Sequence, residues 1–147
     1  MAKPINGKFY PVLIVTLLLD QISKYVIRSW QPDIVLIPKI LNITYITNTG
    51  ASFGILKGMN GILLALSVAV IIGIAFYLKK NPEHISIPFA LILAGALGNS
   101  IDRILFGAVT DFISISVSSF SWPAFNVADS AITVGVVLLL FSEWKEL

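Results

Sequence analysis

Long runs of apolar residues, each bounded by charged or turn-forming residues, dominate the pattern along this chain. Four of these runs approach the roughly 20 mostly apolar residues that an α-helix needs to cross a bilayer. We predict that residues 1–147 form a single integral membrane domain. Its transmembrane helices should cover about residues 9–27, 61–78, 85–101 and 127–141.

Two shorter segments between these helices alternate apolar and polar side chains with the period of a half-buried strand. In the first segment, Leu41, Ile43 and Tyr45 share one parity. In the second, Asp111 shares its parity with Ile113, so a strand would place this carboxylate on the apolar face. The expected fold is a membrane all-α four-helix bundle with a small extramembrane β-sheet.

The composition agrees with an integral membrane protein and argues against several kinds of active site. The chain is 56% hydrophobic and 12% charged, whereas ordinary soluble domains carry about 25% charged residues. Its net charge of +2 is too small to indicate binding of nucleic acid. Cysteine is absent, and the single histidine, His84, lies in a polar turn. We therefore expect no thiol nucleophile, no Ser-His-Asp triad, no metal site and no cofactor.

Charge counting leaves the orientation in the membrane open. Five Lys and Arg residues fall on the side of the termini and five on the other side, so the positive-inside rule gives no answer. If acidic neighbours occupy Lys24 and Arg28, the other charges weakly favour cytoplasmic termini. No small-x-small cleavage site follows the first apolar run, which we expect to remain as a helix rather than be removed as a signal peptide.

Aspartates beside the apolar runs are the candidates for chemistry. A charged side chain at the bilayer centre costs roughly 2.5–3.5 kcal/mol on insertion scales, so such residues are functional candidates by default. All five aspartates fall on the same side of the predicted spans and can meet at one membrane face. The four in or beside apolar runs are Asp20, Asp102, Asp111 and Asp129.

Asp102 is expected to face the interior of the bundle. It continues a row of small residues at four-residue spacing, Ala90, Ala94 and Gly98. Small residues in such a row let transmembrane helices approach one another closely. Asn99 and Arg103 lie within four residues of Asp102 on the same helix, so these side chains should be close neighbours.

Asp111 needs a partner if it lies on an apolar face. A second carboxylate that shares one proton with it would serve, because two close carboxylates do not both ionise readily. One group then acts as acid and the other as base, and such a pair can activate water for amide hydrolysis without metal, Cys or His. Asn48, Asn99 and Asn126 are suited to support this site, because asparagine supplies donors and acceptors without charge.

Structural interpretations of the same polar groups also remain open. An i,i+4 pair on a helix surface contributes only a few tenths of a kcal/mol, about 0.2–0.5. A polar residue before a helix can cap its free N–H groups. The three structural interpretations are a surface pair of Asp20 with Lys24, an N-cap at Asn126 with Asp129 in the first turn, and a buried ion pair of Asp102 with Arg103.

At these positions the sequence resembles the lipoprotein signal peptidases, also called signal peptidase II, over essentially its whole length. The motifs occur in the family's order and at its spacing, with no departure at a motif position. They are Asp20-Gln21-Ile22-Ser23-Lys24, Asn48-Thr49-Gly50-Ala51-Ser52-Phe53, Gly98-Asn99-Ser100-Ile101-Asp102-Arg103, Val109-Thr110-Asp111-Phe112 and Phe125-Asn126-Val127-Ala128-Asp129.

The resemblance implies an aspartic endopeptidase of the bacterial inner membrane. Such enzymes remove the signal peptide from a prolipoprotein by cutting before a cysteine that carries diacylglycerol. The implied partners are these substrates and membrane lipid, with no nucleic acid, and we expect a monomer. The termini would be cytoplasmic and the site would lie at the outer face. The implied catalytic pair is Asp111 and Asp129, lined or ordered by Asn48, Asn99, Arg103 and Asn126, with Asp20, Lys24 and Asp102 as structural supports.

Two other classes of function remain as alternatives. A small transporter or proton-conducting subunit would also carry intramembrane carboxylates, but it would need polar residues at several depths. A non-enzymatic assembly factor would use its aspartates only to cap helices and to pair with Lys24 and Arg103.

Overall fold

The computed structural model describes residues 7–50, 57–118 and 120–144 of the chain. The turn-rich stretch predicted at residues 48–54 extends into residues 51–56, which lie outside the described part, as do three residues of the second motif.

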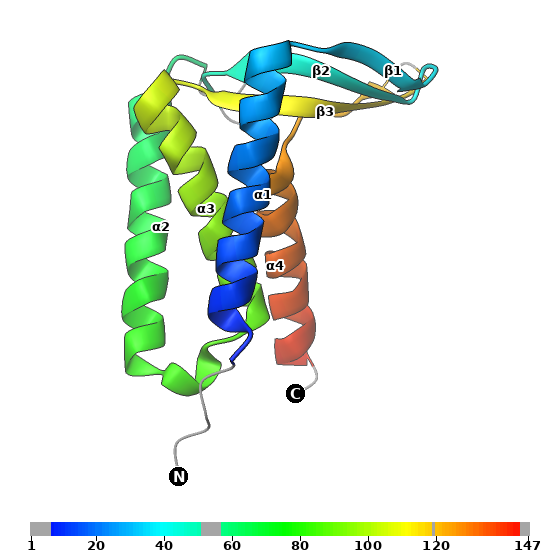
Figure 1. Ribbon diagram of the computed structural model, residues 1–147. Coiled ribbons are helices and arrows are strands. Elements are labelled where there is room, and N and C mark those ends of the chain that lie inside the picture. Colours follow the sequence, from blue (N-terminus) through cyan, green and yellow to red (C-terminus); the bar gives the residue numbers. More distant parts are fainter. Residues whose placement is uncertain (1–6, 51–56, 119, 145–147) are drawn as a thin grey trace.

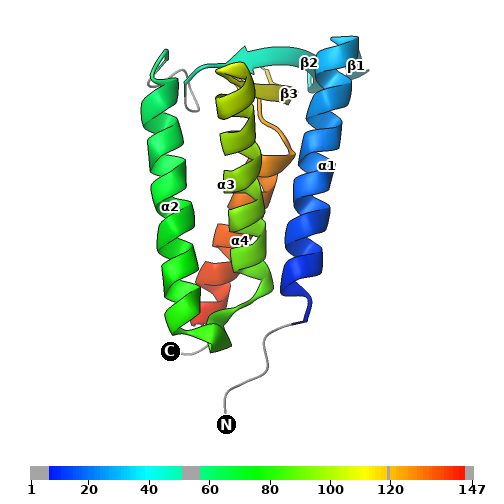
Figure 2. The same cartoon turned by 60° about the vertical axis from the view of Figure 1, so that its left-hand side comes forward.

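Four long helices run side by side, alternately up and down (Figures 1 and 2). They are α1 (Phe9–Trp30), α2 (Asn60–Lys80), α3 (Ile87–Phe106) and α4 (Val127–Trp144), with a short 3-10 helix, η2 (Pro82–His84), between α2 and α3. The helices extend beyond the apolar runs that predicted them. α1, for example, continues past Ile27 to Trp30 and ends where Gln31 adopts a left-handed backbone with φ of 48°.

Three of these helices, α1, α2 and α3, are long and apolar enough to cross a membrane. The apolar part of α4, Val127–Ser142, is shorter. α2 has a single buried residue, Leu78. Many of its other apolar side chains are exposed, and contact with lipid rather than water is the stable arrangement for them; examples are Ile62, Leu66, Val70, Ile72 and Phe76. The protein is thus a membrane protein.

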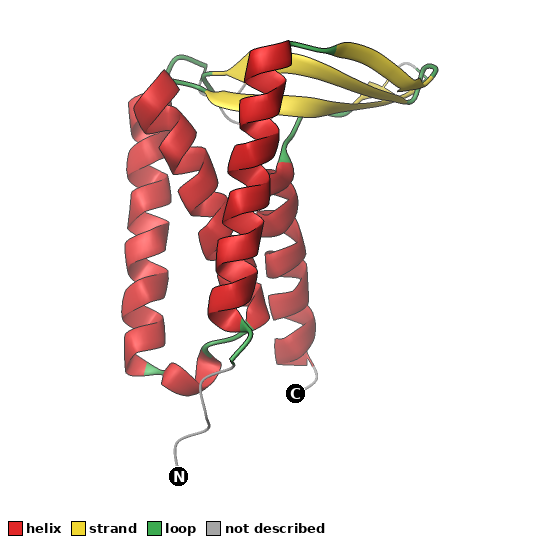
Figure 3. Ribbon diagram, viewed as in Figure 1, coloured by secondary structure: helices red, strands yellow, loops and turns green. Residues whose placement is uncertain are grey.

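An antiparallel sheet lies across one end of the bundle (Figure 3). Its strands are β1 (Asp33–Ile37), β2 (Leu41–Asn48), β3 (Val109–Val117) and β4 (Phe120–Ser121), in the order β1-β2-β3-β4. β2 and β3 pair at the centre, with Ile46 opposite Asp111. The predicted fold class, a helical membrane bundle with a small sheet, is confirmed. The sequence pattern did not reveal β1, which is a mostly exposed apolar strand, or β4, which is only two residues long.

α3 is the central helix of the bundle and packs closely against both α1 and α4. Ala90, Ala94 and Asp102 are fully buried and Gly98 is buried, so the predicted row of small residues faces the interior. A Cβ added to Gly98 would lie 2.3 Å from Asp20 Oδ2, and one added to Gly95 would lie 2.4 Å from a main-chain oxygen of α4. Glycine at both positions is what permits these close contacts.

A Gly98→Ala substitution should therefore destabilise the fold. The new methyl group would meet the Asp20 carboxylate, which is held by an ion pair with Lys24 and by the Ala128 N–H. Overpacking of this kind costs about 1–3 kcal/mol. Gly73→Ala in α2 is the matched control, because nothing lies within 4 Å of its new Cβ. Unfolding in detergent should show a lower free energy of unfolding for Gly98→Ala and an unchanged one for Gly73→Ala. Equal losses of stability in both variants would contradict this packing.

The end of the bundle opposite the sheet is closed by an apolar cluster. Its buried members are Phe9, Leu78, Ala90 and Leu93. Partly buried apolar side chains pack around them: Val12, Leu13, Ile71, Ile74, Ile85 and Phe89. Polar groups of the interior are thus gathered at the sheet end.

Candidate active site

Four buried or partly buried carboxylates come together beneath the sheet, each from a different element. Asp20 comes from α1, Asp102 from α3, Asp111 from β3 and Asp129 from the first turn of α4. Asp20 and Asp102 are fully buried, and Asp111 is 2% exposed. Hydrogen bonds divide the four into two groups with different surroundings.

Asp111 is held by two asparagine side chains. Asn48 Nδ2 donates to Asp111 Oδ2 at 2.9 Å, and Asn126 Nδ2 donates to Asp111 Oδ1 at 2.8 Å. Asn48 is itself fixed, because its Oδ1 accepts a hydrogen bond from the Gly50 N–H at 2.9 Å. The Asp111 carboxyl group therefore has little rotational freedom.

Asp129 is held by Asn99 and by the chain that enters α4. Asn99 Nδ2 donates to Asp129 Oδ1 at 2.7 Å, and the Asn126 N–H donates to Asp129 Oδ2 at 3.2 Å. The Asp129 N–H in turn donates to Asn126 Oδ1 at 2.9 Å. This reciprocal pairing is a capping arrangement at the start of the helix, so the N-cap interpretation of Asn126 is correct.

Capping is only part of what Asn126 does. Its backbone N–H binds one carboxylate, Asp129, while its side-chain amide binds the other, Asp111. Asn126 thus bridges the two groups and is fully buried. An ordinary cap contacts only its own helix, and the bridge to Asp111 in β3 therefore needs a further explanation.

The other two carboxylates form an ion-pair network beside this pair. Lys24 Nζ lies 2.9 Å from Asp20 Oδ2 and 3.7 Å from Asp102 Oδ2. Arg28 Nη1 lies 3.2 Å from Asp102 Oδ1 and donates to Thr110 Oγ1 at 3.0 Å. Since Asp20 also accepts the Ala128 N–H at 2.9 Å, this network ties α1 to α3, β3 and α4.

Two of the structural interpretations are wrong. Asp20 and Lys24 do form an i,i+4 pair, but the pair is fully buried rather than on a surface. Asp102 pairs with Lys24 and Arg28 rather than with Arg103. Adjacent residues on a helix point in different directions, which explains why Asp102 meets α1 while Arg103 reaches toward Gly50 instead.

Arg103 is an incompletely paired cation at the site. Its Nη2 lies 3.5 Å from the Gly50 carbonyl oxygen, and its buried Nε has no hydrogen-bond partner among the described residues. A guanidinium has five donors in a fixed fork, so Arg103 retains capacity to bind an oxygen atom.

Both bridged carboxylates line one small polar cavity of about 220 Å³. Two larger, mostly apolar grooves adjoin it: the α4 groove, of about 530 Å³, and the α2–α3 groove, of about 270 Å³. The polar cavity shares Asp129 with the first groove and Arg103 with the second. The polar cavity is lined by Asn48, Gly50, Ser67, Asn99, Arg103, Val109, Asp111, Ala124 and Asp129.

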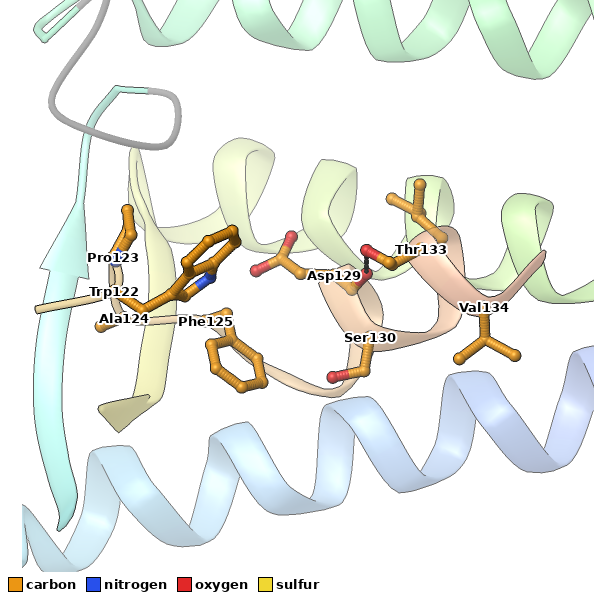
Figure 4. A pocket seen from close by; sticks show the side chains of 9 residues that line it. Trp122, Pro123, Ala124, Phe125, Asp129, Ser130, Thr133 and Val134 are labelled. Carbon is orange, nitrogen blue, oxygen red and sulfur yellow. Dashed lines mark hydrogen bonds between the residues drawn. The ribbon is translucent and has the colours of Figure 1, made fainter. Parts of the chain in front are cut away.

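Figure 4 shows the α4 groove from close by. Trp122 and Phe125 lie at its sheet end, Ser130 and Val134 continue along α4, and Asp129 lies between these two ends. The polar cavity thus meets apolar surface on two sides: beside Asp129 in the α4 groove and beside Arg103 in the α2–α3 groove.

A comparison with protein families gives the same picture as the geometry. A family model described as signal peptidase (SPase) II matches residues 12–145. The chain belongs to the signal peptidase II family. The family resemblance noted in the sequence is confirmed.

Relatives and solved structures agree over most of the peptidase chain. A lipoprotein signal peptidase of Thermodesulfovibrio yellowstonii is 40% identical over 91% of this chain and 92% of its own length. One of Syntrophus aciditrophicus is 43% identical over 86% of this chain and 85% of its own. Two solved structures of bacterial membrane enzymes are each 32% identical to this chain and match 99% of it. The first has a TM-score of 0.87, and the match covers 92% of its own chain. The second has a TM-score of 0.84, and the match covers 98% of its own chain.

Every candidate site residue of this signal peptidase II lies in one contiguous polar region at the sheet end. Sequence reasoning missed three residues there: Arg28, Thr110 and Ser67. Arg28 continues the four-residue spacing of Asp20 and Lys24 along α1, and that spacing is the signal that pointed to it. Nothing in the pattern singled out Ser67, because it is one small polar residue in an apolar helix.

The pKa of Asp111 is raised to about 6, mainly by burial and further by the charge of Asp129, against the lowering effect of the Asn48 hydrogen bond. In the unfolded chain an aspartic acid has a pKa of about 3.9. The folded protein therefore binds more protons between about pH 4 and pH 6, and its stability falls as the pH rises through this range.

The peptidase should thus lose stability relative to an Asp111→Asn variant as the pH is raised from 4 to 7. The free energy of unfolding of the wild type, relative to that of the variant, should fall by up to about 3 kcal/mol over this range, since one pKa unit corresponds to about 1.4 kcal/mol. Unfolding in detergent at several pH values measures it. Asp33→Asn, at an exposed position of β1, is the control and should follow the wild type. A constant difference between wild type and Asp111→Asn across this range would contradict the burial effect.

Proposed function

We propose that this peptidase removes signal peptides from lipoprotein precursors by cutting before a cysteine that carries a diacylglyceryl group. Asp111 and Asp129 are the catalytic pair. One observation carries the proposal: these two carboxyl groups are bridged by Asn126 and line the same polar cavity. Both come from one chain with all their asparagine partners, so the enzyme acts as a monomer.

The chemistry needs no group beyond the pair and a water molecule. One carboxylate takes a proton from water as the water oxygen bonds to the scissile carbonyl carbon. The other carboxyl group gives its proton to the carbonyl oxygen. The tetrahedral intermediate then collapses and the C–N bond breaks. The nitrogen leaves with a proton from the group that had gained one, while the other carboxylate takes a proton from a hydroxyl group of the intermediate, which becomes the new carboxyl terminus, so both groups return to their starting states. General acid–base catalysis of this kind contributes about 10²- to 10⁴-fold.

The supporting residues keep the pair in position. Asn48 and Asn126 fix Asp111, and Asn99 fixes Asp129. Arg103 lines the cavity, and the single hydrogen bond of its guanidinium among the described residues is a long one, so this group is placed to bind a carbonyl oxygen of the substrate chain. Asp20, Lys24 and Asp102 support the site by joining α1 to α3 and α4.

The apolar grooves suit a lipid-bearing substrate. The signal peptide is an apolar segment and the diacylglyceryl chains are hydrocarbon. Both can lie against apolar surface while the scissile amide enters the polar cavity, because the cavity opens onto the two grooves. Burial of acyl chains contributes about 0.8 kcal/mol per CH₂ group, which can hold the scissile bond in place.

A transporter or proton-conducting subunit is less well supported. A proton path needs ionisable groups at several depths. Here the carboxylates gather at the sheet end, and the apolar cluster of Phe9, Leu78 and Leu93 closes the other end of the bundle. A purely structural role leaves Asp111 unexplained, because it caps no helix and two asparagines hold it in a cavity.

The orientation in the membrane is part of the proposal. We place the protein in the bacterial inner membrane with four spans, both termini in the cytoplasm, and the sheet and active site at the outer face. Lys57, just before α2, and Lys80, at its last residue, are both exposed in a chain that has no cysteine. An impermeant thiol reagent should label Lys57→Cys in spheroplasts and Lys80→Cys only after permeabilisation. The reverse result would contradict this orientation.

The function is tested by incubating the purified protein in detergent or vesicles with a diacylglyceryl-modified prolipoprotein. Release of the signal peptide by the wild type, and not by Asp111→Asn or Asp129→Asn protein, is the expected result. Failure of folded wild-type protein to release it would overturn the proposed function. Release with both variants still active would leave the function but remove the catalytic pair.

A further inference from the structure

Lys24 is a buried cation whose contacts go beyond the ion pairs of α1. Its side chain is fully buried beneath the sheet. Besides its carboxylate partners, Nζ donates a hydrogen bond to Asn99 Oδ1 at 2.8 Å. Asn99 is the residue whose amide nitrogen binds Asp129. A hydrogen-bonded chain thus runs from Lys24 through Asn99 to Asp129.

This chain fixes which way the Asn99 amide points. Asn99 Oδ1 accepts from Lys24 Nζ and also from Asn126 Nδ2 at 3.2 Å. An ammonium group can only donate, so the oxygen of the amide must face Lys24. The nitrogen is thereby forced toward Asp129. Without Lys24, the longer hydrogen bond from Asn126 Nδ2, at 3.2 Å, would be left to hold the amide oxygen on this side, and the amide would be freer to turn its oxygen toward the Asp129 carboxylate.

We propose that Lys24 is a positioning residue that, through Asn99, keeps Asp129 as the ionised base of the catalytic pair and leaves the proton on Asp111. This inference rests on the proposed function. In the first step Asp129 takes a proton from water, the water oxygen bonds to the scissile carbonyl carbon, and Asp111 gives its proton to the carbonyl oxygen. After this step Asp129 is protonated and Asp111 is a carboxylate.

The surroundings of the two carboxyl groups favour negative charge on Asp129 more than on Asp111. The ammonium of Lys24 polarises the Asn99 amide, and hydrogen bonds in such chains strengthen one another. Asp129 also lies in the first turn of α4 and accepts the Asn126 N–H, where the helix dipole favours negative charge. Asp111, in a strand, accepts its hydrogen bonds within the described part of the chain from the neutral side-chain amides of Asn48 and Asn126.

Other charged groups near the pair are shared or already paired. Asp20 lies against Lys24, and Asp102 is shared between Lys24 and Arg28. Arg103 lines the cavity beside both carboxyl groups, so it does not distinguish Asp111 from Asp129. The charge of Lys24 acts on both carboxyl groups, but the amide that accepts from Lys24 donates to Asp129 and not to Asp111.

The test removes Lys24 without leaving an unpaired buried charge. The double variant Asp20→Asn/Lys24→Met loses one charge of each sign, and Asp102 keeps Arg28 at 3.2 Å and the Thr110 N–H at 2.9 Å. Asp20→Asn alone is the matched control, because it keeps Lys24. The measurement is kcat/KM for the lipidated precursor against pH, whose acid limb reports ionisation of the base in the free enzyme.

The Asp20→Asn/Lys24→Met variant should lose about tenfold or more in kcat/KM near neutral pH. A loss of this size corresponds to the contribution of one hydrogen bond to a charged group. The acid limb of this double variant should move to higher pH by about one unit. Asp20→Asn alone, which removes a negative charge and keeps Lys24, should not move the limb to higher pH. Asn99→Ala on the Asp20→Asn background should produce the same shift. Adding Lys24→Met to it should produce no further shift, because both residues act through one contact.

An acid limb that stays in place in the double variant would overturn the role of Lys24. Additive shifts from Lys24→Met and Asn99→Ala would also overturn it, because they would mean separate actions. Lys24→Gln on the same background repeats the test if the methionine variant does not fold. These outcomes are read on an enzyme that cleaves the precursor, so they differ from failure of the proposed function, in which the wild type itself does not cleave.

Discussion

Asp111→Asn and Asp129→Asn should each abolish turnover, a loss of about 10⁴-fold, while leaving the protein folded. Asparagine nearly keeps the shape of aspartate but can neither take a proton from water nor give one to the carbonyl oxygen. Asp111 and Asp129 face one cavity and share Asn126. They should therefore act as a unit, and the double variant should be little worse than either single variant.

The quantity to measure is turnover per folded molecule, with the fold checked separately by unfolding in detergent. Asp20→Asn and Asp102→Asn are the controls, because they remove buried carboxylates of the ion-pair network and not of the catalytic pair. They should reduce stability and retain partial turnover. Near-normal turnover in either Asp111→Asn or Asp129→Asn protein would contradict the assignment. Complete loss in folded Asp102→Asn protein would move that residue into the catalytic set.

An unlipidated precursor should be a poor substrate, with kcat/KM at least about a hundredfold lower than for the diacylglyceryl form. The polar cavity opens onto apolar grooves, and burying five CH₂ groups contributes about 4 kcal/mol, roughly a thousandfold in binding. Part of that energy is offset by the ordering of flexible chains. The loss should appear mainly in KM if the chains only anchor the substrate, and in kcat as well if they align the scissile amide.

The comparison requires two precursors of identical sequence that differ only in modification of the cysteine. A third precursor whose cysteine carries a short alkyl group controls for blocking the thiol, and it should behave like the unlipidated form. Equal rates for all three would mean that the grooves contribute nothing to recognition.

Helix positions and the central strands could be predicted because their signals are local. An apolar run of about 20 residues or an alternation with a period of two is visible in the chain itself. β1 escaped detection because its mostly exposed apolar residues show no alternation, and β4 because two residues carry no pattern. Their pairing is set by β2 and β3, which are neighbours in space.

The candidate site residues were found from residue type and position, but their contacts were not. Adjacent numbering suggested that Asp102 would pair with Arg103, whereas its partners come from α1, more than 70 positions away in the chain. The crossing of α1 and α3 decides that pairing, and it depends on glycines such as Gly98. Likewise, nothing in the sequence indicates that Asn126 reaches across to Asp111 in β3.

The most direct test of the proposed chemistry is the mass of both products when purified protein cuts a diacylglyceryl-modified prolipoprotein in the presence of a strong chelator. Two aspartates and water should suffice, so cleavage should continue at its usual rate. It should give one intact signal peptide and one product that begins with the lipidated cysteine. Loss of cleavage on chelation, restored by a divalent metal, or a cut at another bond, would contradict an aspartic peptidase that acts before the lipidated cysteine.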